Sequence, residues 1–408
     1  MREIGRKGMN RAAAARGKKA AFGEDLDLEK YTMEAPEHAY QEKMSELAEM
    51  DRKRMEMAGV DAGGKERSGS FVQLDNSVVH RSAGEKGVEV LGTREALEKY
   101  DWLQEYMWKT VDVDADKFTA AVELDDFNGY FIRALPGART VFPVQACLYI
   151  KQQGLAQRVH NIIIAEEGSE LHIITGCTSD ARLPAGLHLG VSEFYVKKGA
   201  QVTFTMVHNW AENLDVRPRT GTIVEEDGVF ISNYICMEPV RSLQMYPKAS
   251  LVGRGALARY NSILVAQKGS SMDVGAKVSL EAPGSRAEVV ARAITRGGDI
   301  ISRGLLVGEV EGVKAHLECR GLILAERGLI HAIPELVGKV EGVDLSHEAA
   351  VGKIAKEEVE YLMARGLSEE EATATIVRGF LNVNIEGLPP ILQSEMQTML
   401  EQLEEKAL

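Results

Sequence analysis

The feature that most constrains this sequence is a glycine that recurs through its middle, each time followed by a short apolar strand. One or two polar or charged residues precede the glycine, as in Glu166-Glu167-Gly168 and Lys197-Lys198-Gly199. The pattern recurs at Gly168, Gly199, Gly228, Gly255, Gly269, Gly284, Gly312 and Gly328, at intervals of 31, 29, 27, 14, 15, 28 and 16 residues. These intervals are near one or two units of about fifteen residues, which is typical of a coil that adds one rung after another.

Two architectures fit this pattern. A parallel β-helix and a long β-sandwich both consist of short strands with glycine at their corners, and ordinary hairpins also produce glycine turns. On either side of the strand-rich part the sequence is typical of helices. We therefore expect a mainly β protein with an N-terminal helical region over residues 1–124, a β core over 125–354 and a C-terminal helical domain over 355–408.

Helix signals are clearest at the C-terminal end. Residues 368–371 (SEEE) read as a capping box, and Gly366 ends the helix before it. Val359, Leu362 and Met363 form an apolar stripe on that earlier helix, and prolines 389 and 390 open a last one. Such a stripe near a chain end packs on its own domain or serves as a docking surface for a partner. In the N-terminal region we expect helices around 37–57 and 94–109.

Charge and hydropathy exclude several classes of protein. The formal net charge of −13 argues against nucleic-acid binding by the body of the protein. Residues 1–22 are basic, and we interpret them as a solvated, frayed terminus. The longest apolar run there, 12–15, is too short for a signal peptide, and no stretch reaches the length of a membrane span. We expect a cytoplasmic protein without membrane contact.

Nucleotide motifs are also absent from the sequence. Every Gly-Lys pair lacks the Ser or Thr that follows in a phosphate-binding loop, so we expect no bound nucleotide and no ATP hydrolysis by this chain. Residues 253–258 imitate a dinucleotide fingerprint but lie among the glycine-turn repeats with no long helix after them.

The four cysteines, Cys147, Cys177, Cys236 and Cys319, are separated by 30, 59 and 83 residues. No pair has the spacing of a zinc knuckle or a thioredoxin-like redox site. In a reducing compartment we expect free thiols. A metal would need ligands brought together by folding or by a second subunit.

Cys177 and Cys319 have the most suggestive surroundings. Cys177 closes a strand before a polar loop, where side chains become reachable from outside, whereas Cys319 lies within a strand on an apolar parity. A cysteine on such a parity is usually a buried small hydrophobe, and we place Cys147 and Cys236 in that class.

Four further side chains are candidates with ordinary alternatives. Alternation puts His347 with its apolar neighbours and Glu348 on the opposite face, so a regular strand does not let both bind one metal. His208 and Trp210 share a parity with Val202, Phe204 and Met206, which favours a hydrogen-bonded core pair over an internal polar path.

Several motifs in order carry a family resemblance. Residues 346–354 (SHEAAVGKI), 357–367 (EEVEYLMARGL) and 376–381 (IVRGFL) resemble the C-terminal signature of the SufB/SufD family. Upstream, residues 131–137 (FIRALPG) and 143–146 (PVQA) resemble the segment with which the β-helix of that family begins. Residues 165–169 (AEEGS), 176–178 (GCT) and 208–210 (HNW) resemble SufB in particular.

This resemblance implies a right-handed parallel β-helix flanked by helical segments. It also implies a scaffold, not an enzyme, that accepts sulfur as a persulfide from a cysteine desulfurase or another donor and assembles an iron–sulfur cluster transiently. A separate ABC-type ATPase, SufC, would be its partner, and a second copy of the chain would complete a homodimer.

The site residues are carried over position by position. Cys177 matches the proposed sulfur acceptor and Cys319 the thiol proposed to hold the nascent cluster, with His347 and Glu348 matching the adjacent His-Glu pair. Three residues match those proposed to line the route between the two thiols: Lys151, His208 and Trp210. His208 stands where SufB typically has Gln, and the N-terminal region has no cysteine motif for a cluster.

Two other functions remain open. One is a SufD-like structural partner of the same complex that accepts no sulfur; matches at Cys177 and Cys319 favour the SufB-like reading. The other is a carbohydrate-active β-helix enzyme, which would need clustered carboxylates that this sequence does not show.

Overall fold

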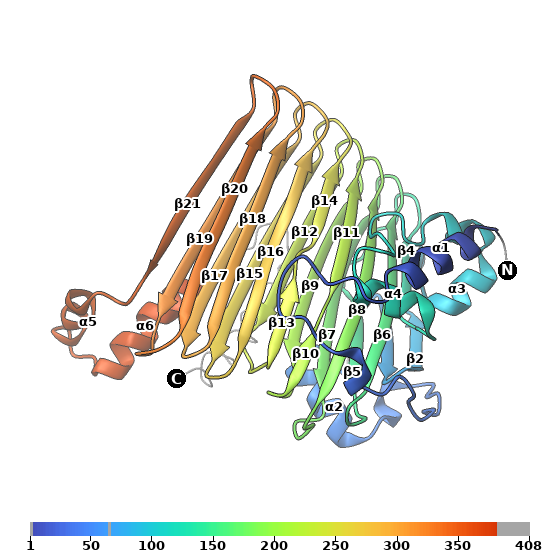
Figure 1. Cartoon of the computed structure of the whole chain (residues 1–408), viewed down its shortest axis with the longest axis horizontal. Coiled ribbons are helices and arrows are strands. Elements are labelled where there is room, and N and C mark those ends of the chain that lie inside the picture. The colour runs from blue at the N-terminus through green and yellow to red at the C-terminus, as the bar shows by residue number, and fades with distance from the viewer. Residues whose placement is uncertain (1–2, 64–66, 382–408) are drawn as a thin grey trace.

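The computed structural model describes residues 3–63 and 67–381 as a long parallel β-helix with helices at both ends (Figure 1). Within these residues the strands form two sheets. Sheet I contains, in spatial order, β2 (Ser77–Ala83), β1 (Gly69–Leu74), β5 (Val144–Ile150), β7 (Glu170–Ser179), β9 (Gln201–Asn209), β12 (Val229–Cys236), β15 (Leu257–Gln267), β17 (Arg286–Arg296), β19 (Lys314–Ile323) and β21 (Asp344–Gly352).

Sheet II faces it across the interior. Its strands are β3 (Val88–Gly92), β4 (Tyr130–Ala134), β6 (Ala156–Ala165), β8 (Gly186–Val196), β10 (Leu214–Val216), β11 (Arg219–Val224), β13 (Ser242–Met245), β14 (Lys248–Leu251), β16 (Ser271–Leu280), β18 (Asp299–Gly308) and β20 (Leu329–Gly338). Because the chain alternates between the sheets, the unit of about fifteen residues is half a turn and the longer interval is a full turn.

Apart from the antiparallel pairs β1–β2 and β3–β4 at the N-terminal end, pairing within each sheet is parallel and in register. On sheet I, β15 pairs β17 from Leu257↔Arg286 to Gln267↔Arg296, and β17 continues the same register onto β19. Such pairing stacks equivalent positions of successive turns above one another. The parallel β-helix is therefore confirmed, and the sandwich alternative is excluded.

Glycine is required at the corners by backbone conformation. Gly168 and Gly199 have φ of 67° and 64°, in the left-handed region that L side chains rarely adopt. Gly228 is an exception, because its neighbour Asp227 takes the positive φ of 52°. A Cβ on Gly228 would lie 2.9 Å from a methyl of Val224, so close packing selects this glycine.

The interior between the sheets is a packed apolar core. Phe194, Phe204 and Phe230 stack along it with ring centroids 4.8 and 5.0 Å apart. Burial of each such ring stabilises the fold by about 2 kcal/mol.

The N-terminal region is less helical than expected. Its helices are α1 (Glu3–Ala14), α2 (Glu49–Met57), α3 (Thr93–Lys99) and α4 (Lys117–Leu124), with 3-10 turns η1 (Leu28–Lys30), η2 (Met44–Glu46) and η3 (Asp101–Glu105). The predicted helices over 37–57 and 94–109 were thus too long. Strands β1, β2 and β3 also belong to this region, where they extend both sheets past the first turn and cover an edge that would otherwise be unpaired.

The first residues are not frayed in the described part, although most of the side chains described there are exposed, as expected. Ala12 and Ala15 are buried against Val113 and Ala120, which joins the end of α1 and the turn after it to the start of α4. Small apolar side chains allow this close approach.

The C-terminal helices are α5 (Lys356–Met363) and α6 (Glu369–Leu381). The capping box is confirmed: the Ser368 N–H donates to Glu371 Oε2 at 2.8 Å, and the Glu371 N–H donates to Ser368 Oγ at 3.1 Å. Val377 and Leu381 of α6 pack on the outer surface of sheet I. The helix expected after prolines 389 and 390 lies outside the described residues.

Candidate functional site

Two columns of side chains run along the interior face of sheet I. The Cys177 column places Cys177, His208 and Cys236 at equivalent positions of β7, β9 and β12. The Cys319 column lies two residues earlier on each strand and contains, in order, Met206, Tyr234, Ser262, Ala291 and Cys319. Parallel register thus relates residues that are 28 to 31 positions apart in the sequence.

Cys177 lies inside the β-helix with its side chain in the apolar core. It is fully buried, so the expectation that a strand end makes it reachable from outside was wrong. Burial raises the pKa of the Cys177 thiol well above its ordinary value, because a thiolate there loses its hydration. On the outer face, the segment after α2 packs so closely that a Cβ on Gly176 would lie 2.6 Å from the Ala58 carbonyl oxygen.

His208 and Trp210 form a polar group next to this thiol. The Tyr234 hydroxyl lies 2.7 Å from His208 Nδ1, whereas His208 Nε2 and Trp210 Nε1 have no hydrogen-bond partner. The ring of His188 lies 5.1 Å from that of Trp210, between centroids. Burial holds the pKa of His208 well below its usual range, so the imidazole is neutral. A neutral imidazole with a free nitrogen can exchange a proton.

Lys151 lies elsewhere. Its Nζ donates to Asp51 Oδ2 of α2 at 2.8 Å, and its side chain is one third exposed. The preceding residue, Ile150, faces the interior. The structure therefore brings His208 and Trp210 together with Cys177 but does not bring Lys151 to them.

Cys319 lies near the C-terminal end of the solenoid. Its thiol is buried and accepts a hydrogen bond from Ser302 Oγ of β18, 3.6 Å from Sγ. Burial raises the pKa of this thiol. One strand further on, β21 completes sheet I in the described part of the chain.

His347 and Glu348 occupy opposite faces of β21. His347 pairs with Leu317, whose side chain is interior, so His347 lies on the same face as Cys319 and on the adjacent strand. Strand spacing and rise place their Cα atoms roughly 8 Å apart. Glu348 pairs with Glu318 on the outer face, where Arg320 forms an ion pair with each.

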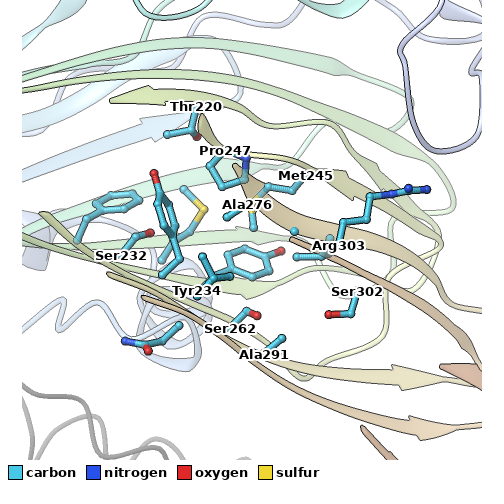
Figure 2. Close-up of a pocket in the computed structure, with 17 residues that line it drawn as sticks. Thr220, Ser232, Tyr234, Met245, Pro247, Ser262, Ala276, Ala291, Ser302 and Arg303 are labelled. Carbon is cyan, nitrogen blue, oxygen red and sulfur yellow. The ribbon is translucent and has the colours of Figure 1, made fainter. Parts of the chain in front are cut away.

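A cavity of about 40 Å³ lies beside the Cys319 column, next to Tyr234 and Ser302. Tyr234, Ser262, Ala291 and Ser302 surround it, as Figure 2 shows. It exists because Ser262 and Ala291, with small side chains, separate Tyr234 from Cys319 in one column. The space holds one to three waters, or a sulfur atom, but not a cluster.

Comparison with known proteins now bears on this geometry. A family model described as SUF system FeS cluster assembly, SufBD core domain, matches residues 148–380. An iron–sulfur cluster assembly SufBD family protein of Methanothermobacter thermautotrophicus is 50% identical over 399 residues, covering 96% of this chain and 97% of the relative. Proteins of the same description from Archaeoglobus fulgidus (50% over 355 residues, 87% and 95% covered) and Staphylococcus epidermidis (31% over 386 residues, 92% and 82% covered) are also similar.

This chain belongs to the SufBD family. Membership connects it with iron–sulfur cluster assembly and agrees with the β-helix described above. Among the residues that the structure describes, no helix has the length and apolar character needed to cross a membrane.

In this SufBD protein, sequence reasoning missed four residues at the cavity: Tyr234, Ser262, Ala291 and Ser302. A signal for the first three was present, because steps of 28, 29 and 28 residues back from Cys319 reach Ala291, Ser262 and Tyr234. Ser302 belongs to the other sheet, and no such step predicts its contact with Cys319.

The C-terminal end of the SufBD solenoid is open in the described residues. Strands β20 and β21 each pair on one side only. Leu329, Leu336, Val337 and Val351 are exposed on these strands, at 53, 37, 41 and 43%. Unpaired strand edges with apolar side chains are surfaces on which another chain can add.

Proposed function

We propose that this chain is a cytoplasmic scaffold for iron–sulfur cluster assembly. Cys177 accepts sulfur as a persulfide from a cysteine desulfurase or another donor, and the nascent cluster is held at Cys319 and His347. A SufC-type ATPase supplies ATP hydrolysis, and a second copy of the chain completes the cluster site.

The observation that carries this proposal is the placement of both thiols on one interior wall. Cys177 and Cys319 face the same lumen of sheet I, five strands apart, with His208, Tyr234 and the cavity between them. Five strand spacings correspond to roughly 24 Å. An apolar core needs neither two thiols nor a buried imidazole with an unpaired nitrogen in this arrangement.

The chemistry suits these groups. A thiolate is the nucleophile that takes up sulfane sulfur, and the raised pKa of Cys177 means that it needs a proton acceptor. His208 lies on the adjacent strand at the same register and has a free Nε2. Thiolate and imidazole are usual ligands of iron–sulfur centres, which fits Cys319 and His347.

Glu348 and Lys151 have weaker support. Glu348 lies on the outer face with Arg320, so its ligation of a cluster would require that ion pair to open. Lys151 lies with Asp51 outside the lumen, and its part in sulfur transfer stays a prediction.

A shared cluster site follows from the donor count. Among residues 3–63 and 67–381, no group of three or more His, Cys, Asp or Glu residues is arranged to hold a metal ion. A two-fold related copy at the open end would double the set to two thiolates and two imidazoles.

The test is persulfide mapping on the full chain with a cysteine desulfurase and labelled cysteine. We expect label on Cys177, loss of labelling in Cys177→Ser, and continued cluster reconstitution of that variant from iron and free sulfide. Cys147→Ser is the matched control, since Cys147 is equally buried but packs in the separate cluster beneath α2.

Persulfide forming at the normal rate on Cys177→Ser would contradict the proposal. A wild-type chain that takes up no sulfur yet assembles with its partners would instead indicate the SufD-like structural role.

A further inference from the structure

Cys236 is a buried thiol to which neither the family match nor the proposed function gives a role. It is 1% exposed and lies in the interior core. It occupies the Cys177 column, two strands beyond Cys177 and on the side toward Cys319. A buried cysteine by itself is most often a small hydrophobe, so the case depends on its surroundings.

The residue between the two thiols is His208. It pairs with Cys177 on one side and with Cys236 on the other. Its imidazole is 2% exposed, and its Nε2 has no partner. An unpaired polar atom in a dry interior costs about 1 to 3 kcal/mol, which a purely structural histidine would not retain without a reason.

Tyr234 connects this group to Cys236 and to the cavity. Its hydroxyl bonds His208 Nδ1 at 2.7 Å, and it lies two residues before Cys236 on the same face of β12. The Cys236 thiol itself donates to the Glu238 backbone carbonyl, 4.0 Å from Sγ. The same side chain lines the cavity that extends to Ser302, the hydrogen-bond partner of Cys319 (Figure 2). Cys236 therefore lies two residues from the tyrosine that joins the polar group next to Cys177 to the cavity.

We propose that Cys236 is a second sulfur-carrying thiol, which receives sulfane sulfur from Cys177 inside the β-helix. This inference rests on the proposed function, because it requires Cys177 to be loaded first.

The transfer balances without an oxidant or reductant. The Cys236 sulfur attacks the outer sulfur of the Cys177 persulfide, forming a new S–S bond while the bond to Cys177 Sγ breaks. The proton leaving Cys236 passes through Tyr234 and His208 to the released Cys177 thiolate. The products are a Cys177 thiol and a Cys236 persulfide.

Distance sets the conformational requirement. Two strand spacings separate the Cα atoms of the two cysteines by about 10 Å, and a persulfide extends one side chain by about 2 Å. Both side chains must turn along the column while the His208 ring swings aside. By contrast, direct transfer from Cys177 to Cys319 would have to cross five strand spacings, roughly 24 Å.

The decisive measurement uses full-length Cys319→Ser, in which sulfur cannot reach its final thiol. After loading by a cysteine desulfurase with labelled cysteine, the protein is quenched in acid, alkylated and mapped by mass spectrometry over time. We expect label on Cys177 first and on Cys236 second. Cys177→Ser/Cys319→Ser should leave Cys236 unlabelled.

A second measurement follows sulfur in chains that keep Cys319. We expect Cys236→Ala to load Cys177 normally and to slow labelling of Cys319 by tenfold or more, whereas Cys147→Ala changes neither. Cys236→Ser serves as the replacement if the alanine variant is unstable, and thermal unfolding checks each fold.

The possible outcomes separate this inference from the proposed function. If Cys177 is labelled, Cys236 never is, and Cys319 is reached normally in Cys236→Ala, the inference is overturned while the proposed function stands. If Cys177 itself takes up no sulfur, both are overturned.

Discussion

Single residues inside the solenoid owe their protonation states to the loss of surrounding water. Burial lowers the pKa of His188 to about 3 and raises the pKa of Cys236 to about 12. Neutral imidazoles and protonated thiols are therefore the resting forms near neutral pH. Proton exchange between them costs less than creating an isolated charge in the apolar core, which is why a buried His208 with an unpaired Nε2 beside two thiols suits sulfur chemistry.

The buried histidines predict a loss of stability in acid. The folded pKa of His188 lies below its unfolded value of 6.5, so the unfolded chain binds the proton first as the pH falls. Its contribution is fully present above pH 6.5 and is lost as the pH falls toward 3. Between pH 7 and pH 5 we expect this residue to lower the free energy of unfolding by about 2 kcal/mol, with His208 acting in the same direction.

Urea unfolding at both pH values measures this loss. His188→Gln keeps a donor for Gln157 Oε1 and should flatten the pH dependence, whereas His331→Gln, at an exposed position, should leave it unchanged. An unaltered slope in His188→Gln would assign the effect to other groups.

Helix α5 has no buried residue, so its apolar side chains are poorly covered. Tyr361 and Met363 are 57% and 41% exposed, and Glu357, Tyr361, Leu362 and Ile376 line a groove between α5 and α6. By contrast, α6 packs Val377 and Leu381 against the outer face of sheet I. Of the stripe expected from the sequence, Val359 and Leu362 are half-buried and Met363 is exposed, so the domain covers it only in part.

We expect α5 to bind the SufC-type ATPase. Tyr361→Ala combined with Met363→Ala should weaken binding at least tenfold, because exposed aromatic and apolar side chains dominate such contacts. Titration calorimetry or pull-down with the purified ATPase measures the change.

Point variants are a sharper test than deletion of residues 356–408. The deletion would also remove α6 and expose the apolar residues of sheet I that α6 covers. Met50→Ala on α2, 76% exposed, is the matched control. Binding that survives the double variant at full strength would place the ATPase elsewhere.

The whole molecule has two unlike ends. At the N-terminal end, β1 to β3 and the helices around them cover the first turn, whereas in the part of the chain that the structure describes β20 and β21 leave the last turn open (Figure 1). Terminal repeats of solenoids need a cover to stay soluble and unpaired edges recruit other chains. Cys319 and His347 lie at this end, so the surface that suits a second copy is also the place where the proposed cluster ligands need completion.

We expect one cluster per dimer after anaerobic reconstitution. Cys319→Ser and His347→Ala should each abolish it, and mixed dimers with one mutant subunit should hold it weakly. Iron and sulfide assays combined with analytical ultracentrifugation give both quantities.

Leu336→Asp and Val351→Asp should produce monomers that lose the cluster, because a charge at the exposed end opposes dimer contact. Val141→Asp, 63% exposed on a loop far from this end, should leave dimer and cluster intact. A stable cluster on a strictly monomeric form would refute the shared site.

Local features of the chain were predictable from the sequence. The glycine repeat reports corners that need positive φ, the Ser368–Glu371 pattern reports a helix start, and alternation alone separates His347 from Glu348. Each of these features depends on the backbone conformation of one residue or on residues a few positions apart, and such local patterns can be read directly from a sequence. These local features left a β-helix and a β-sandwich both possible, and the family resemblance predicted the β-helix.

Tertiary structure decided what the register brings together. Cys177, His208 and Cys236 become neighbours because successive turns stack with offsets of 31 and 28 residues. The glycine intervals approximate these offsets, but only the pairing of the assembled sheet fixes which residues meet. The same holds for Ser302 beside Cys319 and for Lys151 beside Asp51. Strands β1 to β3 were not predicted. They are stabilised by pairing with strands that are distant in the sequence, and the free energy of that pairing depends on the assembled sheet, not on the residues of the segment.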